Sequence, residues 1–128
     1  MRVFTTKWLV RWARRERIAD HSLREAIERA ERGLIDADLG GNIIKQRVAR
    51  TGQGRSGGYR MLVVYQVGHR AVFLYGFAKS ERENIDADEL LTLREIGGAW
   101  LAADPRRIAQ AIKEGALQEI TYGENEAS

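Results

Sequence analysis

The 128-residue sequence has no cysteine, a single proline and only two histidines, His21 and His69. Without cysteine the chain can form no disulfide, no thiolate metal site and no cysteine nucleophile. Two histidines also argue against a histidine-rich metal centre, so we expect neither a metal nor a cofactor. No apolar run approaches the roughly 20 residues of a membrane span, and the charged stretch that follows Met1 is not typical of a signal peptide. We therefore expect a cytoplasmic protein that does not bind membranes.

Acidic residues are absent from one long segment, 39–80, although the whole chain contains 18 of them. The segment has a charge of +7, whereas the other 86 residues carry 14 basic and 18 acidic side chains, or −4, which gives the net charge of +3. A rigid surface of one sign attracts a polyanion. Nucleic acid is therefore the first expected partner, and an acidic protein segment is the second. The seven cations are Lys45, Arg47, Arg50, Arg55, Arg60, Arg70 and Lys79.

Helical periodicity marks the start of the chain. Phe4, Trp8 and Trp12 lie four residues apart, which predicts an amphipathic helix with these side chains facing the core. Ser22 and Glu25 match the pattern of a capping box, so a second helix is predicted to begin there. The two helices would form an N-terminal hairpin. The predicted buried side of the second helix consists of Leu23, Ala26, Ile27, Ala30 and Leu34.

The hydrophobic period changes from helical to alternating inside the acid-free segment, where strands are predicted over 43–50, 59–67 and 70–78. In the first strand Lys45 and Arg47 share one face, because successive side chains alternate. A short turn joins the last two strands, which indicates an antiparallel meander. Together these elements predict an α+β fold, with the helical hairpin packed on a small antiparallel sheet.

The remainder of the chain is mostly acidic and is predicted to be helical. A long helix begins near Asp86 and a shorter one near Asp104, and 117–122 predicts a last strand. We interpret 1–104 as the main domain. Residues 105–128 form a C-terminal extension with a short helix, a strand and a polar tail, and we expect them to belong to the same single domain.

One motif, Gly52-Gln-Gly54-Arg-Ser-Gly57, matches the spacing of a dinucleotide-binding fingerprint. Such a fingerprint needs a helix directly after it to receive the pyrophosphate, but a strand pattern follows here. We therefore reject the cofactor interpretation. The sequence instead predicts a glycine-rich hairpin loop that presents Arg55 to a phosphate backbone.

The aromatic residues of the predicted sheet allow two interpretations. Tyr59 lies on one side of its strand and Arg60 on the other, and Tyr75 lies in the next strand. Core packing suits any single aromatic side chain, whereas base stacking requires the ring on the cationic face. Alternation alone does not decide between them, because a bulge changes which side a residue faces.

The cations could support chemistry as well as binding. RNA scission by 2′-hydroxyl attack needs a base, an acid and a positive charge close to the phosphorane. Neighbouring cations favour the neutral form of a lysine, so Lys45 or Lys79 could move a proton, and Glu81 is the other candidate base. The residues alone thus indicate a phosphate-binding sheet and leave ribonuclease activity open.

Two segments, 57–65 and 75–85, resemble the RelE/HigB superfamily of bacterial type II toxins. The basic strand 44–48 and the predicted helical hairpin fit the same family order. The resemblance covers roughly 1–104 and is densest over 43–86. It implies an mRNA interferase that cuts translated messages in the ribosomal A site without a metal and leaves a cyclic phosphate. It also implies a hetero-oligomer with a cognate antitoxin, commonly a helix-turn-helix protein, that covers the cationic face.

The resemblance also implies roles for individual residues. Lys45 and Arg47 would bind and activate the scissile phosphate, and Arg60 would stabilise its developing charge. Lys79 and Arg82 would belong to the segment that completes the site. The expected catalytic residues are Lys45, Arg47, Arg60, Lys79 and Glu81, and the expected RNA-binding residues are Arg50, Arg55, Tyr59, Tyr75 and Arg82.

Two positions depart from the family pattern. Ser80 stands where the best-studied members have an arginine, and Asp86 stands near their tyrosine, the proposed base or stacking group. Either Glu81 or Tyr75 replaces that tyrosine, or the activity is weak. Two rival functions stay open: a toxin of the same fold that poisons gyrase without cutting RNA, and a non-catalytic nucleic-acid-binding module.

Overall fold

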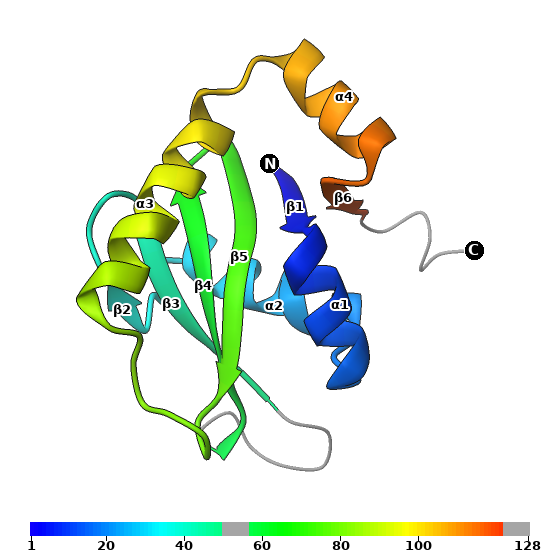
Figure 1. Ribbon diagram of the computed structural model, residues 1–128. Coiled ribbons are helices and arrows are strands. Elements are labelled where there is room, and N and C mark those ends of the chain that lie inside the picture. Colours follow the sequence, from blue (N-terminus) through cyan, green and yellow to red (C-terminus); the bar gives the residue numbers. More distant parts are fainter. Residues whose placement is uncertain (50–56, 122–128) are drawn as a thin grey trace.

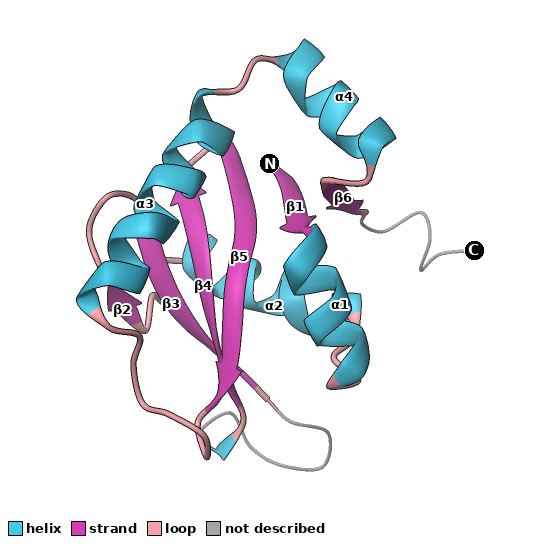
Figure 2. Ribbon diagram, in the orientation of Figure 1, coloured by secondary structure: helices cyan, strands magenta, loops and turns pink. Residues whose placement is uncertain are grey.

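The computed structural model describes residues 1–49 and 57–121, and within them it contains six strands and four helices (Figures 1 and 2). The strands are β1 (Arg2–Thr6), β2 (Ala37–Asp38), β3 (Ile43–Val48), β4 (Tyr59–Gln66), β5 (Arg70–Ala78) and β6 (Leu117–Ile120). The helices are α1 (Lys7–Arg15), α2 (Asp20–Glu31), α3 (Ala87–Ala102) and α4 (Pro105–Glu114). The predicted α+β class is confirmed.

All six strands belong to one sheet with the order β2-β3-β4-β5-β1-β6. The central strands β3, β4 and β5 form the predicted antiparallel meander. β1 lies parallel to β5 and antiparallel to β6, so the sheet is mixed and not purely antiparallel. The first and last of the described strands, β1 and β6, are therefore neighbours, as Figure 1 shows.

The first residues form a strand and not the predicted start of a helix. Phe4 is in register with Val72 of β5 on one side and with Glu119 of β6 on the other. α1 begins directly after Thr6, whose hydroxyl accepts a hydrogen bond from the Leu9 backbone N–H at 3.3 Å. The predicted N-terminal helical hairpin is thus wrong at its start. Local spacing carries no information about pairing with strands from distant parts of the chain.

The three predicted aromatic side chains do not form one helical stripe, and one of them, Trp8, is not buried. Trp12 is buried as predicted, against the side of the sheet that α1 and α2 cover. Phe4 is fully buried but packs in the core on the opposite side. Trp8 is 43% exposed.

α2 differs from the prediction at both ends. Its cap position holds Ala19, which makes no side-chain cap hydrogen bond, so the capping box predicted at Ser22 does not form. Beyond its end, Leu34 is exposed and not buried. The central part of the prediction is confirmed, with buried residues Leu23, Ala26, Ile27 and Ala30.

The sheet has a hydrophobic core on each side. On the first side, which we call the α1/α2 face, buried residues include Leu9, Ile27, Met61 and Phe73. On the second side, which we call the α3 face, they include Phe4, Leu62, Val64 and Ile108. Figure 1 shows α3 lying across this second face. The N-terminal end of β4 and the C-terminal end of β5 extend beyond the helix. α3 itself therefore does not extend over that end of the sheet.

The C-terminal elements form as predicted. The Asp104 side chain caps α4 by accepting a hydrogen bond from the Arg107 backbone N–H at 2.8 Å. Gly115, with φ +82°, ends the helix, and β6 follows. Ile108 is fully buried in the α3-face core, so α4 packs against the sheet that β6 extends.

Gly97 allows α3 to lie very close to the sheet. A Cβ atom at this position would lie 2.9 Å from the Val64 Cβ and 3.2 Å from the Leu74 Cδ1. The neighbouring Gly98 faces open space, because a Cβ atom there would meet nothing within 4 Å.

These two glycines make a matched pair for a stability test. Gly97→Ala is expected to destabilise the protein by about 1–3 kcal/mol, because the new methyl group overpacks the contact between helix and sheet. Gly98→Ala is expected to stabilise it by up to about 1 kcal/mol, because alanine favours the helix. Urea unfolding measures both free energies, and equal effects of the two changes would contradict the close approach of α3.

Candidate nucleic-acid interface

Three of the predicted catalytic cations lie together on the α3 face. In the β3–β4 ladder Arg47 lies opposite Arg60, and Lys45 lies opposite Leu62. Because side chains alternate along a strand, all three cations point to the same side as Leu62, which belongs to the α3-face core. Arg60 is the second residue of β4. The arginine pair therefore lies at the end of the sheet that extends beyond α3 (Figure 1).

A bulge decides which aromatic residues join these cations. The β4–β5 register runs from Leu62 opposite Tyr75 to Val63 opposite Phe73, and so skips Leu74. Tyr75 and Phe77 consequently lie on the α3 face, and Phe77 is the register partner of Arg60. Their ring centroids are 6.2 Å apart.

Tyr59, which we expected to contact RNA, has a structural place instead. It lies on the α1/α2 face, is 2% exposed and packs edge-on against Trp12, with ring centroids 5.4 Å apart. Its hydroxyl is 3.1 Å from the Glu16 Oε1. A base cannot reach this ring, so the expectation for Tyr59 is wrong.

Asp36 holds Arg47 in place from the segment that precedes β2. Its Oδ1 accepts a hydrogen bond from the Arg47 Nη2 at 3.1 Å, and its Oδ2 accepts one from the Arg47 backbone N–H at 2.7 Å. The buried Arg29 donates to the same Oδ2 at 3.3 Å. Burial alone would raise the pKa of Asp36, but the hydrogen bonds from Arg47 and Arg29 outweigh it and hold that pKa below its usual value.

Arg60 lies in a less favourable environment for a cation. Burial, followed by repulsion from Arg47, lowers the pKa of Arg60, and attraction to Asp36 offsets only part of this. An arginine remains protonated nonetheless, because its ordinary pKa lies far above neutral pH. Two guanidinium groups on facing strands thus lie close enough to repel each other, and an anion bound between them would relieve that repulsion.

The loop after β5 brings further polar groups to this face. The Lys45 Nζ donates a hydrogen bond to the Asn84 Oδ1 at 2.5 Å. Lys79 and Glu81 are exposed in the turn at the start of the loop, and the Lys79 backbone N–H donates to the Gly58 carbonyl at 3.0 Å. The loop is therefore tied to both β3 and the start of β4.

Arg82 is largely neutralised by the first turn of α3. It donates two hydrogen bonds to the Glu89 carboxylate, at 2.6 and 3.1 Å, and a third to the Asn84 carbonyl at 2.9 Å. The bonds from Arg82 and from the Asp86 backbone N–H lower the pKa of Glu89 to about 2. The Arg82 guanidinium also lies 5.7 Å from the centre of the Phe77 ring.

A small open pocket adjoins these groups between β5 and α3. It has a volume of about 230 Å³ and is lined by Tyr75, Glu89, Thr92 and Leu93. One wall is thus the Tyr75 ring, which lies on the α3 face with the cations, and another carries the Glu89 carboxylate that binds Arg82.

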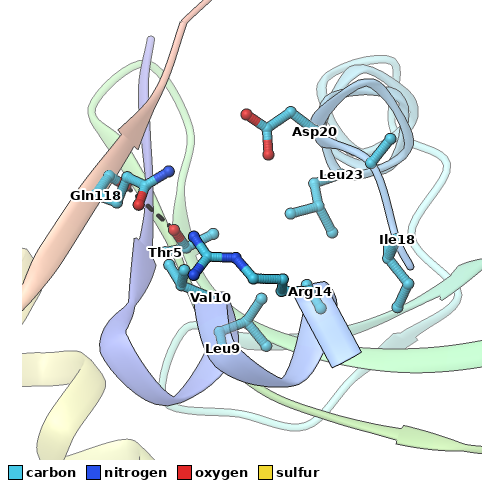
Figure 3. Close-up of a pocket in the computed structure, with 10 residues that line it drawn as sticks. Thr5, Leu9, Val10, Arg14, Ile18, Asp20, Leu23 and Gln118 are labelled. Carbon is cyan, nitrogen blue, oxygen red and sulfur yellow. Dashed lines mark hydrogen bonds between the residues drawn. The ribbon is translucent and has the colours of Figure 1, made fainter. Parts of the chain in front are cut away.

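A second pocket, shown in Figure 3, lies away from the cations. It has a volume of about 190 Å³ and lies between α1, the start of α2 and β6, with Arg14 and Asp20 at its edge. The Thr5 hydroxyl donates to the Gln118 carbonyl at 3.2 Å along its wall. Its lining includes Leu9 and Leu23 of the α1/α2-face core, so it is separated from the cations by the sheet.

The other cations of the acid-free segment have different positions. Arg50 and Arg55 lie outside the described residues. Arg70 is buried and donates hydrogen bonds to the Trp100 carbonyl at 2.7 Å and the Ala103 carbonyl at 2.9 Å. It therefore satisfies the C-terminal carbonyls of α3 and is not part of the cationic face.

Sequence reasoning missed four residues that shape this site. Asp36 and Asn84 contact the cations from loops. Trp8, from a helix that was predicted to bury it, contacts Tyr75 with ring centroids 4.6 Å apart. For Glu89 a signal existed, because Asp86 and Glu89 have the spacing of a capping box, which the structure contains. None of the other three has a local pattern that marks it.

The fold and this face together define a small α+β protein with a candidate polyanion-binding sheet. The family model described as "RelE toxin of RelE / RelB toxin-antitoxin system" matches residues 1–120. The chain therefore belongs to the RelE toxin family: it is a toxin of a type II toxin–antitoxin system with a cognate antitoxin. Toxins of this family are endoribonucleases, which supports a general RNase activity. Neither the curated proteins nor the solved structures provide a significant match.

Two further observations concern the described residues as a whole. No cluster of three or more histidine, aspartate or glutamate side chains within 1–49 and 57–121 has the arrangement of a metal site. Over the same ranges, every helix is too short or too polar to cross a bilayer.

The Arg82–Glu89 pair is expected to make stability depend on pH. A carboxylate whose native pKa lies near 2 stabilises the fold above its ordinary pKa of about 4.5, and this stabilisation is lost as the pH falls toward 2. Glu89→Gln should therefore flatten the fall in melting temperature between about pH 4.5 and 2. Glu95→Gln, an exposed change in the same helix, is the control. A Glu89→Gln protein with the wild-type pH profile would contradict the ion pair.

Proposed function

We propose that this toxin is a ribosome-dependent mRNA endonuclease that uses the α3 face of its sheet and needs no metal. One observation carries the proposal: Arg47 and Arg60 face each other across β3 and β4, with Lys45 beside them on the same side. Holding like charges in register costs stability. A phosphate bound between them turns this cost into binding energy.

The chemistry follows from what each cation can do to a phosphodiester. Attack by the 2′-hydroxyl forms a new P–O2′ bond, breaks the P–O5′ bond and leaves a cyclic phosphate and a free 5′-hydroxyl. Lys45 and Arg47 bind the nonbridging oxygens and orient the phosphate for in-line attack. Arg60 stabilises the negative charge that accumulates on the phosphorane. Lys79, in the adjacent turn, extends the positive surface along the strand.

Proton transfer needs a base for the 2′-hydroxyl and an acid for the leaving oxygen. Tyr75 lies on the cationic face, and Glu81 lies in the exposed turn after β5. These two are the candidates that replace the tyrosine expected near Asp86. Substituting each in turn and comparing single-turnover cleavage rates separates their roles.

The cognate antitoxin is proposed to be a helix-turn-helix protein that covers the α3 face. A segment with acidic side chains would satisfy the Arg47–Arg60 pair as the phosphate does, and would exclude RNA from it. The toxin and antitoxin would then form a hetero-oligomer in which the cationic face is not accessible.

Arg60→Ala is expected to abolish growth inhibition and to lower the rate of mRNA cleavage on translating ribosomes by about 10²- to 10³-fold. The fold should be unaffected, and the melting temperature should stay the same or rise, because the change removes repulsion with Arg47. Arg106→Ala, an exposed change on α4, is the matched control. A toxic Arg60→Ala variant would remove Arg60 from the active site.

Cells that express the wild-type toxin also allow the proposed function to be distinguished from its rivals. Mapping transcript 5′ ends with and without translation should reveal cuts at codon positions only when ribosomes are active. Intact transcripts with arrested replication would instead identify a gyrase poison, and binding without cuts would identify a non-catalytic module.

RNA binding should weaken steeply with salt, because each neutralised phosphate of a single strand contributes about −0.7 to the log–log slope. Arg60→Ala should make this slope shallower by about 0.7, whereas Arg106→Ala should not change it. Titrations of the toxin with ribosome-bound mRNA between roughly 50 and 200 mM salt measure both slopes. An affinity that does not change over this range would favour a partner other than nucleic acid.

A further inference from the structure

We propose that Trp8 and Tyr75 form a stacking platform for one unpaired base of the bound RNA strand, beside the phosphate held by Arg47 and Arg60. This inference rests on the proposed function and adds to it a residue from α1 that places the substrate. Four observations carry it: the exposure of Trp8, its contact with Tyr75, the row of rings that leads to Arg60, and the charge of the surrounding face.

Trp8 is the most exposed aromatic side chain in the described part of the chain, at 43%. Its ring is nevertheless held in place, since its centroid lies 5.8 Å from that of Trp12, with the planes 15° apart. Trp12 itself is buried and packs on the sheet where Gly76 leaves room for its ring. An exposed ring fixed by a buried one loses little conformational freedom when a ligand stacks on it.

The position of Trp8 follows from the β1–α1 connection. β1 pairs with the first half of β5, and α1 then continues beside the second half, as Figure 1 shows. The Thr6 hydroxyl, at the start of α1, lies 3.5 Å from the Leu74 carbonyl. The first turn of α1 is thereby held against β5, and the Trp8 ring lies over Tyr75 with centroids 4.6 Å apart.

The aromatic row continues from this pair to the cations. The Tyr75 and Phe77 centroids are 6.2 Å apart, and Phe77 is in register with Arg60. Phe77 is itself buried under the Arg82 guanidinium, so it links the Trp8–Tyr75 pair to Arg60 and does not take a base. Aromatic rings beside a cationic track are the arrangement with which proteins bind single-stranded RNA, because bases stack on the rings while phosphates meet the cations.

The charge of the face favours RNA over an apolar protein segment as the occupant. Lys45, Arg47 and Arg60 adjoin the rings on the α3 face, and Lys79 follows β5 directly. Other exposed apolar side chains of the described residues are aliphatic, such as Val67 in the turn between β4 and β5 and Ile112 on α4. Trp8 therefore combines a ring suited to stacking with the cationic surroundings that a nucleotide needs.

The test uses the full-length toxin and an RNA trinucleotide made uncleavable by 2′-O-methyl groups. Trp8→Ala is expected to weaken trinucleotide binding about tenfold, which is within the range for the loss of one base stack. Trp8→Phe should retain most of the affinity, and Val67→Ala should bind like wild type. An abasic trinucleotide of the same charge should bind wild type and Trp8→Ala equally, since it has no base to stack.

The outcomes separate this inference from the proposed function. Trinucleotide binding by Trp8→Ala at wild-type strength, or a loss that persists with the abasic ligand, would overturn the platform even if the wild type cuts mRNA on ribosomes. In that case we would assign the exposed Trp8 ring to contact with a protein partner. Wild-type toxin that binds the trinucleotide through Trp8 but cuts no mRNA would overturn the nuclease proposal alone.

Discussion

The register between β3 and β4 is the constraint on which the cationic face depends, because it places Arg47 opposite Arg60. A shift of β3 by one residue would turn Arg47 to the α1/α2 face, away from Arg60, and would also bring Gln46 out of its buried site. Gln46 opposes such a shift, since its side-chain amide donates to the Ala26 carbonyl at 2.9 Å and its Oε1 accepts from the Asp36 backbone N–H at 2.8 Å. The buried amide that fixes the strand thus also positions the aspartate that pairs with Arg47.

The segment that lacks acidic residues in the sequence does not lack them in space. Asp36 pairs with Arg47 from before β2, and Glu89 pairs with Arg82, just beyond the segment, from α3. The charge of +7 inferred from 39–80 therefore overstates the field at the sheet surface. The positive charge that these carboxylates do not neutralise is more local than the sequence suggested. Repulsion from Arg47 lowers the pKa of Arg60 more than attraction to Asp36 raises it, and the proposed phosphate site lies between these two arginines.

Local patterns predicted the central strands and the C-terminal elements because their signals lie within each element. Alternation marked β3 to β5, and the Asp104 cap with its following proline marked α4. β1 was mistaken for a helix, because its strand state depends on pairing with β5 and β6. Similarly, the side of the sheet on which Tyr75 lies depends on the bulge at Leu74. Tyr59 is buried, and therefore is not part of the site, because α1 covers its side of the sheet. Contacts across the chain decide all three, and single-sequence patterns do not contain them.

The misassigned strand matters for the proposed stacking platform because it changes where α1 begins. A helix that started at Phe4 would have carried Trp8 into the core with Trp12. With β1 inserted between β5 and β6, α1 starts at the middle of β5, and its first turn lies at the border between the two faces of the sheet. Trp12 then packs on the α1/α2 face while Trp8 contacts Tyr75 of the α3 face. The parallel pairing of β1 with β5 therefore does more than extend the sheet, since it brings the exposed Trp8 ring against Tyr75, which lies on the same face as Arg47 and Arg60.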